Sequence, residues 1–407
     1  MILKLAWRNI WRNKRRTLIT VASIFFAVLI AISMNSFQEG AYDQMIESAA
    51  GLYTGYAQVH QAGYWDDQTL ENSFELSEAL LEESEAHPLV SQAVPRLESF
   101  ALASSEVHTK GCMVVGIDPG KEDVLTQLSK RVVEGKYLDS STPSGALMGI
   151  GLAERLKLAV GDTLVLLGQG YHGVSAAGKY PVVGKVKLAS PEMDKQMVYL
   201  QVGEAQYLYG ADQRLTSVSL AVESPRRVQA IVNNLKTKLP EDYEVMSWQE
   251  MMPELVQMIE ADRAGNVVTI GILYVIIAFG IFGTVLMMTA ERKYEFGILT
   301  SIGMKKPKLA FTVTLELFFM SLIGVLAGAL CSLPIVYYFN RNPVDMGQEA
   351  REAYEAMGVS MEAVIPMTIE PSIFLSEALT VFVMTLLIAI YPFWKILRLK
   401  PIEAMKK

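Results

Sequence analysis

The chain has 407 residues, 51% of them hydrophobic, and its 36 basic and 43 acidic residues give a formal net charge of −7. An acidic balance argues against nucleic acid as a partner. The charges are segregated, and four stretches carry none: 17–38, 264–290, 317–340 and 378–394. Because a helix needs about 20 apolar residues to cross the hydrocarbon core, the sequence predicts an α-helical membrane protein with four spans.

The basic residues predict the orientation of these spans. Residues 1–16, 291–308 and 395–407 together hold 16 of the 36 basic residues. Short loops rich in Lys and Arg stay in the cytoplasm, which places residues 39–263 and the short loop 341–372 outside. The spans are then 17–38, 264–290, 309–340 and 373–394. We expect the first to remain uncleaved, since its apolar run is longer than that of a signal peptide.

Residues 1–16 form an amphipathic pattern. At 100° per residue, one side holds the basic residues and the other holds apolar ones: Lys4, Arg8, Arg12, Arg15 and Arg16 against Leu3, Ala6, Trp7, Ile10 and Trp11. Such a helix suits the headgroup layer. Two interpretations stay open, a general topology signal and an elbow helix that braces the first span.

The region 39–263 has mixed α/β character between two helical stalks, 38–50 and 248–264. Alternating apolar residues predict strands at 55–60, 96–103, 112–117, 163–167, 182–188, 198–200, 215–222 and 243–246. Helices are expected at 76–87, 151–158 and 225–238, and a turn at 118–120. Cys112 falls outside the membrane and Cys331 within the third span, so we expect no disulfide. A stiff stalk transmits displacement, whereas a Gly/Ser linker would absorb it.

The segment 291–306 is short, charged and rich in helix formers. Glu291, Arg292 and Glu295 cluster at the end of a span, where an ordinary cytoplasmic loop needs only bases, and Gly297 and Gly303 fall where a short helix would turn. The pattern E-R-x-x-E-F-G-x-L-x-S-I-G resembles the coupling segment of FtsX/MacB-type ABC-transporter permeases. Stretches 54–65, 115–119 and 149–162 further resemble the MacB-like periplasmic domain, closest to the lipoprotein-releasing (LolC/LolE-type) branch.

This resemblance implies a function and several partners. In the family, the coupling segment docks into a separate ATPase, so the implied contact residues are Glu291, Arg292, Glu295, Phe296, Gly297, Ile298, Leu299, Ile302, Gly303 and Met304. A second permease subunit, identical or not, and a periplasmic lipoprotein carrier or fusion protein are further implied partners. ATP and Mg would bind the partner ATPase, in agreement with the lack of a G-x-x-x-x-G-K-[ST] loop here.

The residues offer little chemistry of their own. The four histidines are widely spaced without H-x-x-x-H or C-x-x-C, so we expect no metal, no cofactor and no catalytic residue in this chain. Small residues let membrane helices approach closely, and the candidates are Gly271, Gly280, Gly283, Gly324 and Gly328. Packing within the chain and a seam between two chains are both open for them.

The predicted function is mechanotransmission. Hydrolysis inside would move the outer domain through the stalks, to release lipoproteins from the bacterial inner membrane. The charge-free cores argue against a polar conduit through the bilayer. Two alternatives remain: an efflux or peptide-resistance permease of the same architecture, and a non-transporting signal transmitter that regulates cell-wall hydrolases.

Overall fold

The computed structural model describes residues 2–139, 142–188, 191–222, 225–349, 364–401 and 404. It separates into two compact units. The helical unit combines the chain up to Tyr42 with Ile259–Val344 and the part from Val364 onward. The α/β unit consists of Asp43–Met258 and a short segment from Asp345. Residues 350–363 of the predicted external loop, and part of the C-terminal tail, lie outside the described residues.

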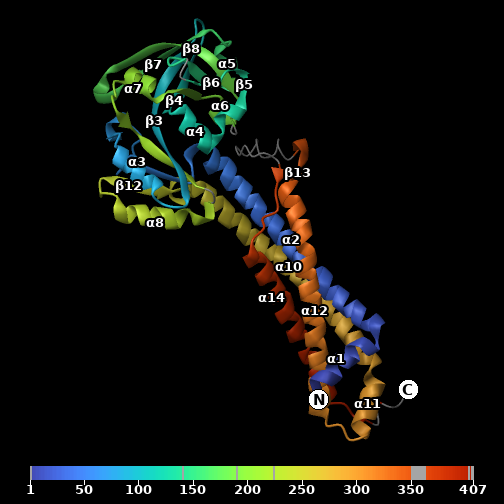
Figure 1. Cartoon of the computed structure of the whole chain (residues 1–407). Coiled ribbons are helices and arrows are strands. Elements are labelled where there is room, and N and C mark those ends of the chain that lie inside the picture. Colours follow the sequence, from blue (N-terminus) through green and yellow to red (C-terminus); the bar gives the residue numbers. More distant parts are fainter. Residues whose placement is uncertain are drawn as a thin grey trace. The chain divides into compact units, whose positions relative to one another are not determined.

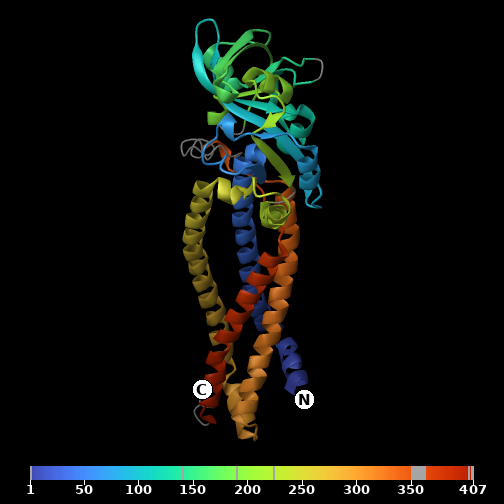
Figure 2. The same cartoon turned by 90° about the vertical axis from the view of Figure 1, so that its left-hand side faces the viewer.

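The helical unit is a bundle of long helices (Figures 1 and 2). Its elements are α1 (Ile2–Arg12), α2 (Lys14–Ile46), α10 (Pro253–Glu291), α11 (Lys293–Ser301), α12 (Lys306–Arg341), α14 (Pro371–Ile388) and α15 (Ile390–Leu397), with the strand pair β13 (Val344–Asp345) and β14 (Val364–Ile365). Four helical stretches in the described chain are long and apolar enough to cross a membrane: Lys14–Gly51, Pro253–Glu291, Lys306–Arg341 and Pro371–Leu397.

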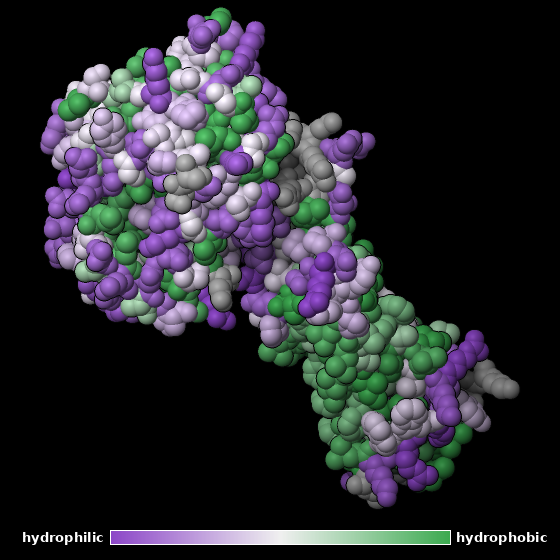
Figure 3. All heavy atoms as spheres, turned by 45° about the horizontal axis from the view of Figure 1, so that its top comes forward, coloured by the Kyte–Doolittle hydropathy of each residue, from purple (hydrophilic) through white to green (hydrophobic). Residues whose placement is uncertain are grey.

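Helix α12 is the best-packed of these four helices. Its Gly324 and Gly328 lie against α2: a Cβ added at Gly324 would come within 2.9 Å of Ile24, and one at Gly328 within 2.8 Å of the carbonyl oxygen of Phe25. By contrast, only 11% of the apolar window of α10 is buried, against 39% for α12. Figure 3 shows hydrophobic side chains along the flank of the helical unit and hydrophilic ones at its end.

The α/β unit is built around a ten-stranded sheet. Its strands are β1 (Ala57–Gln61), β3 (Val90–Ser104), β4 (Thr109–Ile117), β5 (Val132–Gly135), β6 (Ala146–Gly149), β7 (Thr163–Gln169), β8 (Ser175–Val186), β9 (Met197–Gln201), β11 (Ser217–Val222) and β12 (Tyr243–Ser247), and β2 (Phe74–Glu75) pairs separately with β10 (Arg214–Leu215). The order is β12-β1-β11-β3-β4-β9-β6-β8-β5, and β7 pairs with both β3 and β8. These pairings close β3, β4, β9, β6, β8 and β7 into a six-stranded ring.

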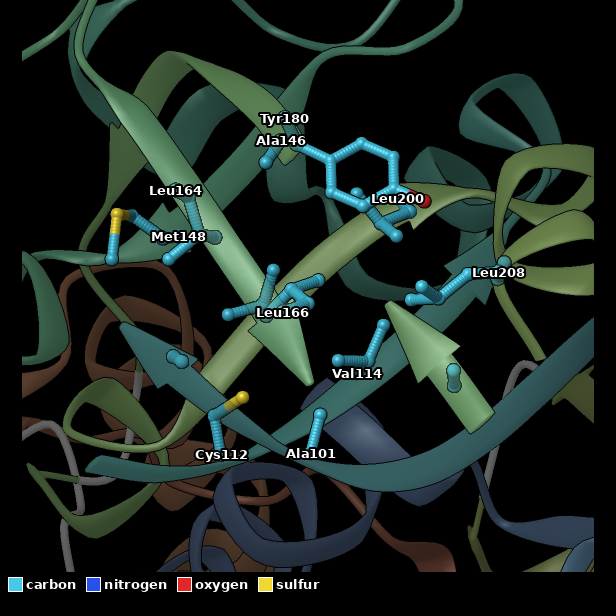
Figure 4. Close-up of a cluster of buried hydrophobic side chains, with 14 of the residues drawn as sticks. Ala101, Cys112, Val114, Ala146, Met148, Leu164, Leu166, Tyr180, Leu200 and Leu208 are labelled. Carbon is cyan, nitrogen blue, oxygen red and sulfur yellow. The ribbon is translucent and has the colours of Figure 1, made fainter. Parts of the chain in front are cut away.

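The interior of this ring is the main hydrophobic core (Figure 4). Alternate residues point inward because successive side chains of a strand face opposite sides. Cys112 and Val114 of β4 meet Leu164 and Leu166 of β7, and all four are buried. The outer faces of β4, β6 and β9 form a second cluster, which includes Val115, Ile117, Leu147 and Tyr199. An ordinary apolar core therefore holds this unit together.

Helices cover the sheet and connect its strands. They are α3 (Glu78–Glu85), α4 (Pro119–Thr126), α5 (Ile150–Leu156), α6 (Pro191–Asp194), α7 (Val202–Tyr209), α8 (Val228–Lys238) and α9 (Trp248–Met251), with single turns at Leu70–Asn72, Leu128–Arg131, Tyr171–Gly173 and Pro225–Arg227. After α2, the chain continues as a π-helical segment, η1 (Glu47–Thr54).

The structure corrects three expected elements. The predicted turn at 118–120 is the start of α4, because the Asp118 carboxylate accepts hydrogen bonds from two backbone amides and Pro119 occupies the first helical position. The predicted stalk 248–264 is interrupted at Met252, before Pro253 begins α10. The predicted helix 1–16 ends at Arg12, and Lys14 already belongs to α2.

Helix α1 buries only part of its apolar face. Ala6 and Ile10 are buried, and α1 packs on α12, where Trp7 meets the ring of Phe319 edge to face. Trp7 nevertheless stays 44% exposed and Trp11 55% exposed. The helix thus braces the bundle with part of its apolar surface and leaves the rest uncovered in the described chain.

Candidate functional site

Helix α11 is a separate short helix between two long ones. Helix α10 ends at Glu291, and Arg292 has non-helical backbone angles that start the new direction of α11. At its other end, Gly303 has φ of +105°, a backbone conformation that residues with a Cβ rarely adopt. The amide of Met304 donates to the carbonyl of Leu299, which closes the helix before α12 begins at Lys306.

A buried ion pair fixes the inner side of α11. The Arg292 guanidinium donates two hydrogen bonds to the Glu316 carboxylate of α12, and both side chains are 4% exposed. Asn9 of α1 donates to the same carboxylate at 2.6 Å. Phe296 is buried below the guanidinium, whose carbon lies 5.1 Å from the ring centre. This network joins α1, α11 and α12.

Glu295 forms a second link between these helices. Its carboxylate accepts from Arg12 of α1 at 2.7 Å and from Arg292 at 3.3 Å. A cavity of about 340 Å³ adjoins this contact and is lined by Leu5, Asn9, Arg12, Arg292, Glu295, Ile298, Leu299, Met304, Leu309, Thr312 and Glu316. Contacts with both α1 and α12 therefore restrain the orientation of α11 relative to these two helices.

The ten residues predicted to contact an ATPase divide into buried, half-buried and exposed groups. Arg292, Phe296 and Gly297 are buried, so they position α11 and present no surface. Glu295, Ile298 and Met304 are half-buried, and the exposed members are Glu291, Leu299, Ile302 and Gly303. Ile302 is 79% exposed and Tyr294, which the prediction omitted, is 54% exposed. The outward surface of this segment thus carries the apolar side chains of Leu299 and Ile302 beside the charged Glu291 and Lys293.

The five glycines expected at helix contacts also divide. Gly324 and Gly328 face α2, as described above. Around Gly271, Gly280 and Gly283 of α10, no heavy atom beyond the helix itself lies within 4 Å of an added Cβ. Within the described chain, these three glycines make no close helix contact.

Polar side chains join the outer half of α10 to its neighbours. Asp262 accepts hydrogen bonds from Gln38 and Tyr42 of α2, the latter at 2.8 Å. Further along, the buried Glu377 of α14 accepts from Asn35 of α2 at 2.8 Å and from Tyr274 of α10. Sequence patterns did not reveal these partners of Glu377.

A buried cluster in the α/β unit fixes the end of the first stalk. Arg96 of β3 makes two hydrogen bonds to Glu122 of α4, at 2.9 and 2.6 Å, and both side chains are 1% exposed. It also donates to the carbonyl oxygen of Tyr53 in η1, and the Tyr53 hydroxyl donates to Glu98. Burial raises the pKa of Glu98. The segment η1 is thus hydrogen-bonded to β3, and Arg96 links that strand to α4.

Sequence patterns gave no sign of this cluster, because a lone Arg in a strand normally faces solvent. A second ion pair joins Arg226 to Asp43 of α2 at 2.9 Å. Among the described residues, no group of three or more His, Cys, Asp or Glu side chains could hold a metal ion.

Comparison with known proteins identifies the family. The FtsX-like permease C-terminal model matches residues 267–401, and the MacB-like periplasmic core domain model matches residues 17–238. The chain therefore belongs to the FtsX/MacB/LolC family of ABC-transporter permeases, as the coupling-segment pattern predicted. Its architecture, with an α/β domain of the MacB type between the first and second apolar helices, agrees with this assignment.

The relatives are distant. The lipoprotein-releasing system transmembrane protein LolC of Xylella fastidiosa is 23% identical over 334 residues, which span 78% of each chain. LolE of Haemophilus influenzae is 19% identical and covers 74% of this chain and 73% of its own. Among solved structures, the periplasmic region of MacB from Actinobacillus actinomycetemcomitans covers 53% of this chain and 97% of its own, at 12% identity and a TM-score of 0.37.

Proposed function

We propose that this chain is the membrane subunit on which a separate ATPase docks, through the outward surface of α11. The observation that carries the proposal is the combination of a firmly held helix with exposed apolar side chains at its end, Leu299 and Ile302. Arg292 and Glu295 bond α11 to α1 and α12, whereas Ile302 is 79% exposed. A force applied to such a helix moves the bundle, because the buried ion pair and Phe296 resist local yielding. The partner would bind ATP and Mg.

The movement would reach the α/β unit through helices. Helix α2 runs from Lys14 to Ile46 and continues as η1 to Thr54, and Tyr53 of η1 is hydrogen-bonded to Arg96 and Glu98 of the sheet. Helix α10 is likewise unbroken from Pro253 to Glu291. A continuous helix transmits displacement better than a flexible linker does. These two connections support mechanotransmission.

Lipoproteins of the bacterial inner membrane are the proposed cargo. The similarity to LolC and LolE supports this choice. An acylated substrate needs an apolar surface at the membrane, and the outer half of α10 offers one, since large side chains there are exposed: Val267, Val268, Ile272, Val275, Ile276 and Phe279. A second permease subunit, identical or different, and a periplasmic lipoprotein carrier would complete the system.

Replacement of Ile302 tests the docking surface without disturbing the internal contacts of α11. We expect Ile302→Asp to prevent co-purification of the ATPase and to abolish ATP-dependent release in proteoliposomes. The matched control is Val107→Asp, since Val107 is 80% exposed in the hairpin between β3 and β4. Full ATPase assembly with Ile302→Asp would contradict the proposed docking surface.

The cargo is tested separately, by mass spectrometry of molecules retained by the complex when hydrolysis is blocked. Lipidated proteins are the expected cargo. Retention of peptides or small molecules alone would contradict lipoprotein release and favour efflux, while leaving the ATPase docking unaffected.

A further inference from the structure

A groove of about 780 Å³ lies where the last apolar helix ends. It is lined by one residue of α11 and by residues from the end of α14 to just beyond α15: Lys293, Leu387, Ile390, Tyr391, Trp394, Lys395, Arg398, Leu399 and Lys400. All of them belong to the helical unit. The groove is separate from the cavity between α1 and α11, with which it shares no residue.

The lining combines two kinds of side chain. Four are cationic and none of the lining residues is acidic. The others are mostly apolar, and Leu387 is 62% exposed and Ile390 57% exposed. Because Leu387 and Ile390 belong to a helix long and apolar enough to cross a membrane, their exposed surface faces acyl chains, while the cations lie at the end of the span.

Contacts among the lining residues orient the cations. The Arg398 guanidinium carbon lies 3.7 Å from the centre of the Trp394 ring, and Lys395 Nζ lies 2.7 Å from the Tyr391 hydroxyl. Stacking fixes the plane of a guanidinium but leaves its edge able to donate hydrogen bonds. Trp and Tyr favour the headgroup level of a bilayer, where their rings are half wet. The aromatic pair therefore positions the cations at the depth of lipid phosphates.

We propose that this groove is a binding site for an anionic phospholipid. Its phosphate lies among Lys293, Lys395, Arg398 and Lys400, and an acyl chain follows Leu387 and Ile390. The charge complementarity selects an anionic headgroup over a zwitterionic one, because each cation near the surface contributes about a fivefold preference. A soluble phosphate compound would leave the apolar wall unused. Since Lys293 begins α11, a bound lipid also touches the segment that carries the proposed docking surface.

Quenching of Trp394 fluorescence tests this site in the full chain. The protein is reconstituted in two sets of phosphatidylcholine bilayers. One set contains a small fraction of brominated phosphatidylglycerol, and the other contains the same fraction of brominated phosphatidylcholine. The Trp394→Phe variant gives the signal of the other tryptophans, which is subtracted. We expect the anionic lipid to bind at least about 25-fold more strongly. The variant Lys395→Gln/Arg398→Gln should lose about 25-fold of this preference, since it removes two cations worth about fivefold each.

A matched control separates the groove from general surface charge. Lys14→Gln/Arg15→Gln removes two exposed bases of α2 that do not line the groove, and it should retain the preference. Equal quenching by both brominated lipids, or equal losses in the two double variants, would contradict the site. Displacement of the brominated lipid by inorganic phosphate at millimolar concentration would instead assign the groove to a soluble phosphate ligand.

Discussion

The buried ion pair of the α/β unit permits a quantitative prediction. Replacing Arg96 with Met leaves the Glu122 carboxylate, 1% exposed, without its cationic partner. Removing one partner of a buried pair costs about 3–5 kcal/mol, since the remaining charge stays desolvated. The variant Arg96→Met/Glu122→Leu removes both charges, so we expect it to recover most of this loss. It should remain about 1–2 kcal/mol less stable than the parent, because the Tyr53 carbonyl loses a donor and the Glu98 carboxylate, 3.8 Å from Arg96, loses its nearby cation.

The natural cysteines provide the assay. Cys112 is 2% exposed inside the strand ring, so its thiol reacts with a maleimide only after the α/β unit opens. With the exposed Cys331 replaced by Ser, urea titration of thiol labelling reports this unit alone within the full-length protein. With a urea dependence of about 2–3 kcal/mol per M, Arg96→Met should lower the midpoint by about 1–2 M.

An exposed ion pair serves as the control. Arg226→Met removes the ion pair with Asp43, in which the side chain of Arg226 is 34% exposed and that of Asp43 is 30% exposed. This substitution should lower the free energy of unfolding by less than about 1 kcal/mol. A loss below about 1 kcal/mol for Arg96→Met would refute the reasoning. So would a double variant as unstable as the single one, since the penalty would then not come from the unpaired carboxylate.

Three further predictions concern pH, packing and topology. Burial lowers the pKa of His60 from 6.5 to about 4. The unfolded chain therefore takes up this proton first, and the free energy of unfolding of the α/β unit should fall by about 3 kcal/mol between pH 6.5 and pH 4. In the Cys112 assay, His60→Phe should remove this part of the pH dependence, and an unchanged profile would contradict the prediction. Gly328→Leu should lower the thermal stability of the bundle in detergent, because the Cβ of the new side chain would lie 2.8 Å from the Phe25 carbonyl oxygen. Gly283→Leu should leave the thermal stability unchanged, since nothing lies within 4 Å of a Cβ there. Equal effects of the two substitutions would show that the contact between α2 and α12 does not determine this stability. A cysteine at Lys305 should react with an impermeant maleimide only after the membrane is opened, and labelling in intact spheroplasts would reverse the orientation.

Sequence patterns predicted the position of most strands because alternation survives wherever one face is buried. Residues 163–167 were expected as a strand, and β7 is Thr163–Gln169. Helix α7 was missed, since its Val202–Tyr209 directly follows β9 and contains Val and Tyr residues that favour strands. The segment 118–120 was misread because Asp, Pro and Gly serve equally in a turn and at a helix start.

For the candidate site, the sequence located the segment but not its support. The separate helix was foreseen, and α11 spans Lys293–Ser301. The partners of Arg292 and Glu295 are Glu316 and Arg12, which lie 24 and 283 residues away along the chain. No local pattern encodes such contacts, because they arise from the packing of three helices. The division of the predicted residues into buried and exposed groups has the same origin.

The most direct test of mechanotransmission is a flexible insertion in either helical connection. A Gly-Gly-Ser insertion after Ser48 interrupts η1, and the same insertion after Met258 interrupts α10. Glycine in a helix interior costs about 1 kcal/mol per residue and creates a compliant joint. The control is the same insertion after Ser105, in the hairpin turn between β3 and β4.

In the reconstituted complex, ATP hydrolysis and cargo release are measured side by side for the three insertions. Mechanotransmission predicts that the Ser48 and Met258 insertions retain basal hydrolysis by the ATPase and lose release, while the Ser105 insertion retains both. Full release by both stalk insertions would contradict the account, because work would then be done between the spans.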